Sequence, residues 1–203
     1  HLSFYQLTIE PNTLFHLHPP QLPGEEVQAE IQDLVARTLA DAGYRHYETS
    51  AYARPGRECR HNLNYWRFGD YLGIGAGAHS KISFRDRVVR QLRHKQPKEY
   101  MRRAAAGTPV AEERVLERHD LAFEFAMNAL RLTDGFPVAL FTERTGLAIT
   151  AIEQALSHAE ARGLLERDHA TVRPTELGRR FLNDLLELFL PEEREPRIVN
   201  REP

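Results

Sequence analysis

The first quarter of the chain alternates between strand-like and helix-like patterns. Residues 2–9 combine β-branched and aromatic side chains in rough alternation and are followed by Pro11, which predicts a strand. Residues 25–41 repeat apolar side chains at helical spacing, and Gly43 stands where helices often end. Residues 44–52 predict a second strand. Together these segments predict a βαβ unit with parallel strands and a right-handed crossover.

A βαβ unit alone leaves its strand edges and sheet faces without partners. The chain begins at His1, without a methionine and next to the predicted first strand. We therefore expect further βα units before His1 in a longer protein. As given, the chain is expected to fold marginally or to complete its core as a homodimer through exposed strand edges.

Beyond the second strand, the pattern is first irregular and then helical. Residues 53–84 predict a long irregular stretch, and Pro97 predicts the start of a short helix within the basic segment 85–103. Residues 111–133 predict a long helix that ends at Asp134–Gly135. Its apolar stripe consists of Val115, Leu116, Ala122, Phe123, Ala126, Met127 and Leu130.

The residues from 136 onward predict a winged-helix-like arrangement. Its elements are a helix over 137–144, a helix over 150–162, a hairpin with strands at 164–167 and 171–173, and a last helix that Thr175 caps. Thr150 and Glu153 have the spacing of a capping box, so they are expected to begin the second of these helices.

Composition and charge exclude several functions. The net charge of −2 is unlike that of a generic nucleic-acid binder. The second helix of the winged-helix-like segment carries Glu153 and Glu160 against Arg162, which repels phosphate, so no DNA partner is predicted. Cys59 is the only cysteine and cannot form an internal disulfide or hold a four-cysteine cluster. Without a signal peptide or a membrane-spanning apolar run, a cytoplasmic location is expected.

Residues 61–66, HNLNYW, carry the most chemistry in the fewest positions. A heme site needs an axial ligand, flat apolar surfaces and cations for the propionates. His61 could ligate the iron, Tyr65 and Trp66 could stack on the porphyrin, and Cys59 is a rival ligand. The arginines that could pair with propionates are Arg54, Arg57, Arg60 and Arg67.

The same segment has a purely structural interpretation. Asn62 and Asn64 could satisfy the backbone of a loop, while Tyr65 and Trp66 anchor that loop to the rest of the fold. Residue chemistry alone leaves both interpretations open.

Two other segments have unusual patterns. Gly73–Ala78 matches G-x-G-x-x-A, but it neither follows a core strand nor opens a helix, so its glycines are expected to allow a close backbone approach. One face of the second predicted strand is polar and consists of Tyr44, His46, Glu48, Ser50 and Tyr52. That face lines either a ligand cavity or a solvent-exposed edge.

Four segments resemble one family, in the same order along the chain: HLSFYQLTIEPNT (1–13), AGYRHYETSAYARPG (42–56), HNLNYWRFGDYLGIGAGAHS (61–80) and GLLERDHATVRPTELGRRF (163–181). The chain resembles the oxygen-independent coproporphyrinogen III oxidase-like radical-SAM proteins. The heme chaperone branch of this family is marked by an HNxxYW segment. Its four defined positions are matched by His61, Asn62, Tyr65 and Trp66.

The resemblance implies an α/β fold. Residues 1–90 would be the C-terminal βα portion of a TIM-like radical-SAM barrel, and residues 91–190 a mostly helical domain with a winged-helix-like end at 136–190. Residues 191–203 are rich in proline, glutamate and arginine and are expected to be disordered. The full-length protein would bind a [4Fe–4S] cluster and S-adenosylmethionine.

The resemblance also implies site residues and a function. Heme or porphyrin would bind at the HNxxYW residues, and weaker S-adenosylmethionine contacts would involve Gln6, Thr8, Ala76 and His79. The CxxxCxxC motif of the cluster is absent, so this chain is not expected to perform radical chemistry alone. The implied function is a heme chaperone that delivers heme to a respiratory protein. The alternatives are oxidative decarboxylation of coproporphyrinogen and, more distantly, nucleic-acid binding.

Overall fold

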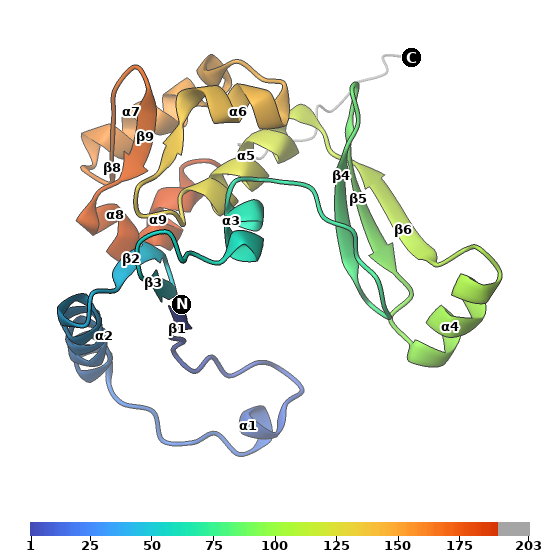
Figure 1. The fold of residues 1–203 in the computed structure, drawn as a ribbon, viewed down its shortest axis with the longest axis horizontal. Helices are drawn as coiled ribbons and strands as arrows, with labels where there is room; N and C mark the ends of the chain where they lie inside the picture. The colour runs from blue at the N-terminus through green and yellow to red at the C-terminus, as the bar shows by residue number, and fades with distance from the viewer. Residues whose placement is uncertain (191–203) are drawn as a thin grey trace, which may run out of the picture.

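The computed structural model describes residues 1–190, whose arrangement is shown in Figure 1. Along the chain, the elements are β1 (Leu2–Ser3), α1 (Leu14–Leu17), α2 (Glu25–Asp41), β2 (Arg45–Glu48), β3 (Ala51–Ala53), α3 (Arg60–Trp66), β4 (His79–Ser83), β5 (Val88–Arg93), α4 (Pro97–Ala105), β6 (Val110–Val115), α5 (Arg118–Ala129), β7 (Phe136–Pro137), α6 (Val138–Thr145), the 3-10 helix η1 (Ile149–Ile152), α7 (Glu153–Ala161), β8 (Leu165–Arg167), β9 (Thr171–Pro174), α8 (Glu176–Arg180) and α9 (Leu182–Glu187). The fold is therefore mixed α and β, as the sequence predicts.

The first sheet has the order β1–β3–β2, and both of its pairings are antiparallel. The predicted pairing of parallel strands is therefore wrong, because β3 lies between β1 and β2. Residues 44–52 form a hairpin rather than one strand, since the chain turns at Thr49–Ser50. The predicted strand over 2–9 is reduced to Leu2–Ser3, because β3 has only three residues to offer as a partner.

Helix α2 has the predicted bounds, but most of its apolar stripe faces outward. Val27, Ile31 and Leu34 are exposed, whereas Leu39, near the C-terminal end, is buried beside β2. The described chain therefore carries an uncovered apolar surface along this helix.

The middle of the chain differs most from the sequence prediction. Residues 53–84 are not wholly irregular, because they contain α3 and β4. The predicted helix over 111–133 is also wrong at both ends: residues 110–115 form β6, which pairs with β5. Helix α5 starts only at Arg118, where Glu117 and Asp120 form a capping box, and it ends at Ala129, before Asp134–Gly135.

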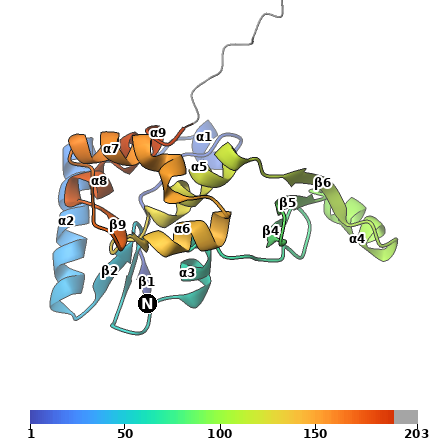
Figure 2. The same ribbon diagram turned by 90° about the horizontal axis from the view of Figure 1, so that it is seen from above.

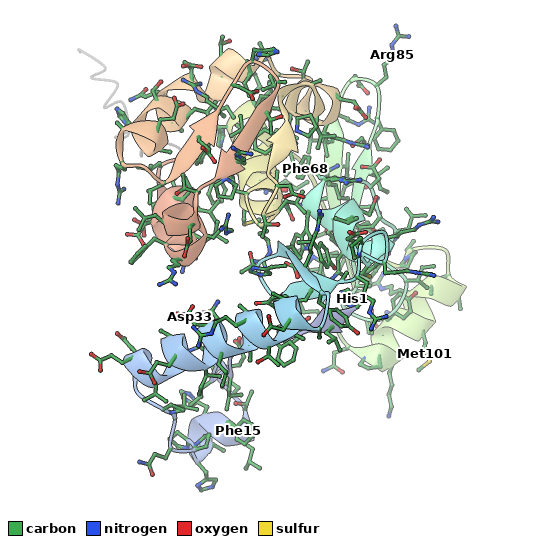
Figure 3. All side chains as sticks on the ribbon, turned by 60° about the vertical axis from the view of Figure 1, so that its left-hand side comes forward. His1, Phe15, Asp33, Phe68, Arg85 and Met101 are labelled. Atoms are coloured by element: carbon green, nitrogen blue, oxygen red, sulfur yellow. The ribbon has the colours of Figure 1, made fainter. Side chains whose placement is uncertain are left out.

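The β4–β5–β6 sheet projects from the rest of the molecule as an arm with α4 at its far end (Figures 1 and 2). Helix α4 starts at Pro97, as predicted. In Figure 3, Arg85 and Met101 lie at outer points of the molecule, and Phe68 lies inside it. The boundary predicted between residues 90 and 91 falls inside β5, so the arm draws on both predicted domains.

The last part of the fold follows the sequence closely, except that the single helix predicted after Thr175 is divided into α8 and α9 at Phe181. The helix predicted over 137–144 is α6, the predicted hairpin is β8–β9, and the Thr175 hydroxyl accepts a hydrogen bond from Gly178 N at 3.0 Å. The capping box at Thr150 is wrong, because η1 occupies Ile149–Ile152 and α7 begins at Glu153. The prediction of disorder concerns residues 191–203, which lie outside the described residues.

The main core lies between α5, α6, α7 and α9. Phe125 of α5 is fully buried and packs edge-on against three other aromatic rings, those of Phe68, Phe136 and Phe141. A smaller cluster under the hairpin contains Tyr47, Ala51 and Ala53, with Leu63 packed against it. Through Phe68 and Leu63, the chain in and after α3 contacts both clusters.

Candidate functional site

Helix α3 contains the whole HNLNYW segment. It has seven residues, starts after Cys59 and receives no hydrogen bond from a capping side chain. A helix this short is unstable alone, so tertiary contacts must hold it. Leu63 supplies one of these contacts by packing against the hairpin cluster.

His61 lies on the exposed side of α3. Its ring meets the Tyr65 ring nearly edge-on, with centroids 4.8 Å apart, and Tyr65 in turn packs against Tyr71 at 4.4 Å. Within residues 1–190, no hydrogen bond involves the His61 imidazole. The ring is therefore oriented by aromatic packing while its nitrogens are available to a ligand.

Asn62 contacts the hairpin rather than loop backbone. Its Nδ2 donates to the Tyr47 hydroxyl at 3.4 Å, and His1 Nε2 lies 2.9 Å from the same oxygen. Burial raises the pKa of the Tyr47 phenol, so this hydroxyl keeps its proton at neutral pH. Asn62 thus ties α3 to β2.

Trp66 has one face covered. The Arg131 guanidinium lies 4.3 Å from the centre of its ring, and the indole Nε1 is buried without a hydrogen-bond partner among residues 1–190. Only the opposite face of the Trp66 ring could therefore stack on a porphyrin, as predicted from the sequence.

The rival ligand and the predicted cations come from the segments before α3, from its first residue and from its C-cap. Cys59 is the N-cap residue, and its free thiol is half-buried two residues before His61. The four arginines Arg54, Arg57, Arg60 and Arg67 are exposed, and Arg54 lies over the Tyr44 ring. The geometry therefore leaves both His61 and Cys59 as candidate ligands at the same end of one helix.

The residues predicted to contact S-adenosylmethionine come from separate segments. Gln6 and Thr8 are exposed in the stretch after β1, Ala76 is exposed in the loop before β4, and His79 begins β4. No hydrogen bond among the described residues joins the first pair to the second. Gly73 does allow a close approach, because a Cβ there would lie 2.2 Å from the His79 carbonyl oxygen.

The polar face of residues 44–52 lies partly in a cleft of about 500 Å³. His46, Thr49 and Tyr52 line it from the hairpin, and the remaining walls come from α2, the segment directly after α5 and α8–α9. Glu48, from the same face, is buried and accepts a hydrogen bond from Ser50 Oγ at 2.9 Å. Some side chains of the polar face therefore line a cleft, and others are buried in the interior.

His46 should make stability depend on pH. It stacks on Tyr52 with centroids 4.4 Å apart, and burial lowers its pKa below the usual 6.5, against an opposing hydrogen bond to Thr49 O. Because the unfolded histidine takes up a proton first, the free energy of unfolding should fall as the pH drops below about 6.5. His46→Phe keeps the stacked ring and should flatten this dependence in urea titrations.

The control for this prediction is His158→Phe, at an exposed position on α7. It should leave the pH dependence as in the wild type. Equal slopes for the wild type and His46→Phe between about pH 7.5 and 5.5 would show that His46 is not the responsible group.

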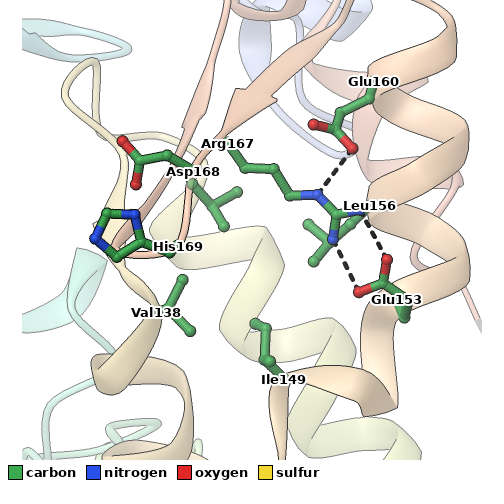
Figure 4. Close-up of a pocket in the computed structure, with 9 residues that line it drawn as sticks. Val138, Ile149, Glu153, Leu156, Glu160, Arg167, Asp168 and His169 are labelled. Carbon is green, nitrogen blue, oxygen red and sulfur yellow. Dashed lines mark hydrogen bonds and ion pairs between the residues drawn. The ribbon is translucent and has the colours of Figure 1, made fainter.

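A second cleft, of about 400 Å³, lies between α7 and the β8–β9 hairpin (Figure 4). There, Arg167 donates to Glu153 at 2.7 Å and 2.9 Å and to Glu160 at 2.8 Å. The arginine in this cleft is thus neutralised by two carboxylates of α7. Such a surface does not favour phosphate.

Sequence patterns did not identify Arg131 as the partner of Trp66 or Glu48 as the buried partner of Arg131. The three residues are far apart along the chain, and none belongs to a motif that predicts their contact. The described residues also contain no group of three or more His, Cys, Asp or Glu side chains arranged to hold a metal ion. No helix among residues 1–190 combines the length and hydropathy needed to cross a bilayer.

Comparisons with known proteins find relatives that are similar in sequence and in fold. A model described as "HemN C-terminal domain" matches residues 116–181. The chain is 48% identical over 193 residues to "Heme chaperone HemW" of Escherichia coli K12, covering 95% of this chain and 50% of that protein. The same description belongs to a Haemophilus influenzae protein that is 45% identical over 194 residues, again with 95% and 50% coverage.

A solved structure shows the same fold. The Escherichia coli coproporphyrinogen III oxidase HemN, described as a radical SAM enzyme, superimposes with a TM-score of 0.61 at 18% identity. The match covers 83% of this chain and 42% of the HemN chain. The chain spans about half the length of the curated relatives it matches. By sequence, the chain is similar to about half the length of these heme chaperones, and its fold is similar to part of HemN.

Proposed function

We propose that the chain is the heme-binding half of a heme chaperone that passes heme to a respiratory protein. The observation that carries this proposal is the exposed His61 at the start of α3, in a segment whose other aromatic residues are packed. Its relatives at 45–48% identity are named heme chaperones. An imidazole with free nitrogens is a common axial ligand of heme iron.

The surroundings of α3 support heme as cargo. Arg57, Arg60 and Arg67 are exposed close to His61 in sequence, and arginine pairs well with propionate carboxylates. One protein ligand suffices for a transferable heme, whereas a [4Fe–4S] cluster needs several thiolates. The single cysteine of this chain does not provide them, so the cluster and S-adenosylmethionine are assigned to a longer protein.

The finer architecture is part of the proposal. β1 would be a late strand of a TIM-like barrel, which is supported by the HemN likeness and by the exposed stripe of α2. The antiparallel β2–β3 hairpin does not fit a barrel of parallel strands and would lie beside it. The segment 136–190 would be a winged-helix-like end of the helical domain, supported by the order α6, α7 and β8–β9. A cytoplasmic location, a respiratory recipient and a homodimer are proposed with it.

The oxidase alternative has less support. Its favourable observation is a fold likeness at 18% identity, which does not distinguish a chaperone from an enzyme. The HNxxYW match and the higher identity to heme chaperones favour the first function. Nucleic-acid binding is disfavoured by the carboxylates that neutralise Arg167 in Figure 4.

The proposed ligand can be tested by titrating the chain with hemin and following the Soret band. His61→Ala should weaken binding by about 100-fold or more, because even residues that only orient a metal ligand contribute roughly 10- to 100-fold. His158→Ala removes an exposed imidazole from α7 and should bind heme like the wild type.

Cys59→Ser distinguishes the rival ligand in the same titration. If binding is lost in Cys59→Ser and kept in His61→Ala, the thiolate is the ligand. If the wild type shows no saturable binding, the chain does not hold heme by itself and the proposed function of this half is wrong.

A further inference from the structure

Three side chains from distant parts of the sequence meet beneath α3. Glu48 comes from β2, Trp66 from the end of α3 and Arg131 from the segment after α5. Arg131 lies over the Trp66 ring at 4.3 Å, and its Nη2 lies 3.6 Å from Glu48 Oε2. We refer to Glu48, Trp66 and Arg131 as the junction cluster.

The backbone holds Arg131 in place independently of α3. Thr49 N donates to Arg131 O at 3.1 Å, and Thr133 N donates to Tyr47 O at 3.2 Å. The Thr133 hydroxyl also donates to His46 O at 2.9 Å. The segment after α5 therefore runs alongside β2 as an additional partner, and the Arg131 side chain reaches from this fixed base to α3.

The junction cluster holds buried polar atoms that are poorly satisfied. Glu48 is 1% exposed, and its Oε2 makes no hydrogen bond within residues 1–190. The same holds for Trp66 Nε1 and Arg131 Nε. Such atoms are costly in a protein interior, and each calls for an explanation other than stability.

The location of the cluster supplies that explanation. Trp66 and His61 are five residues apart on a helix of seven, so the seat of Trp66 sets the direction in which α3 presents His61. Because Arg131 covers one face of the Trp66 ring, this indole fixes the end of α3 to the rest of the fold. A planar guanidinium suits this place because it can stack on the ring and pair with a carboxylate at once.

We propose that Glu48 and Arg131 are positioning residues of the heme site, and that Trp66 contributes to heme binding as the anchor of α3 rather than as a porphyrin-stacking side chain. This inference rests on the proposed function. It extends the site beyond the HNLNYW segment to two residues that act through Trp66 on His61.

Trp66 is the only tryptophan of the chain, so its fluorescence reports on the cluster directly. We would compare the 203-residue wild type with Arg131→Met, Arg131→Lys and Trp66→Phe, and use Arg180→Met as the matched control. Arg180 is exposed, pairs with Asp33 at 3.3 Å, and among the described residues makes no ion pair or cation-π contact with Glu48, Trp66 or Arg131, although it lines the same cleft as Arg131. Thermal unfolding first establishes the temperature at which every variant is folded.

Arg131→Met should shift the emission of Trp66, increase its quenching by acrylamide and weaken hemin binding about 10- to 100-fold. It should also alter the Soret spectrum, which a change in stability alone would not do in folded protein. Arg131→Lys keeps the charge beside Glu48 and should restore part of the affinity. Arg180→Met should leave both readouts unchanged.

Other results would overturn the inference in distinguishable ways. If Arg131→Met shifts the Trp66 emission but leaves hemin affinity and the Soret band unchanged, the cluster is structural only. If Trp66→Phe weakens binding while both Arg131 variants bind normally, the indole contacts the porphyrin directly. If the wild type does not bind hemin, the proposed function fails and the positioning role with it, whatever the fluorescence shows.

Discussion

Replacing Phe125 with alanine should lower the free energy of unfolding by about 3–5 kcal/mol, as expected for truncating a fully buried aromatic side chain. Phe125 has no exposed surface and packs edge-on against Phe68, Phe136 and Phe141, with ring centroids 4.9–5.9 Å apart. These rings come from the turn after α3, from β7 and from α6. Their backbones are held by separate elements, so they cannot easily close the cavity.

Urea titration followed by circular dichroism would measure this loss. Met127→Ala is the control, because Met127 lies on the same helix but is 38% exposed. Its effect should stay below about 1 kcal/mol, as for most partly exposed positions. A similar, small effect for both variants would mean that the ring cluster around Phe125 is not the core of the folded chain.

The elements that sequence predicts well are those whose signals are local. Helix α2 is bounded by Gly24 and Gly43, and α6 ends at Gly146, which has a positive φ of 70°. Thr175 caps α8 through its own hydroxyl. Each of these signals acts within a few residues, so no tertiary information is needed to recognise it.

Sequence reasoning failed where a distant partner decides the structure. Residues 110–115 continue the helical pattern of α5, but β5 offers them a free edge, and pairing with that edge outweighs helix propensity. Residues 44–52 alternate like one strand. The hairpin turn at Thr49–Ser50 is nevertheless fixed by Arg131 and Thr133, which belong to the segment after α5. The local sequence pattern contains no information about such distant partners.

The candidate site likewise combines residues that the local sequence reveals with contacts that only the fold creates. His61, Asn62, Tyr65 and Trp66 are adjacent in sequence and could be selected for their chemistry alone. What each one does depends on residues that only the fold brings together, such as Tyr47 beside Asn62 and Arg131 over Trp66. The sequence therefore predicts the segment as a candidate site, and the structure separates its exposed histidine from the side chains that pack against the rest of the fold.

A buried lysine should give the other large effect on stability. Lys81 Nζ donates to Asp70 Oδ1 at 2.9 Å, to Phe68 O at 3.0 Å and to Ser83 Oγ at 3.2 Å. Its side chain is 2% exposed, whereas that of Asp70 is 44% exposed. Asp70→Ala should therefore cost about 3–5 kcal/mol, because it leaves an uncompensated charge in the interior.

Lys81→Met should cost less than Asp70→Ala, although it breaks the same ion pair. Methionine fills a similar volume without a charge, and the Asp70 carboxylate left behind reaches water and still accepts from Ser83 N at 2.9 Å. Glu166→Ala breaks an exposed pair with Arg173 and serves as the control, with an expected effect below about 1 kcal/mol. Urea titrations of the three variants at neutral pH would establish their order.

The burial of Lys81 beside an exposed Asp70 also predicts that the free energy of unfolding of Asp70→Ala depends on pH. Burial lowers the pKa of Lys81 below its usual 10.5, and Asp70 opposes this effect, so removing Asp70 should lower the pKa further. At pH values between the pKa of Lys81 in the folded variant and its pKa in the unfolded chain, the unfolded chain binds more protons. The free energy of unfolding of the variant should therefore rise with pH relative to that of the wild type. A deficit that stays constant from neutral pH toward about pH 10 would indicate that Lys81 keeps its proton in the variant through contact with water, and that the burial of this lysine depends on Asp70 itself.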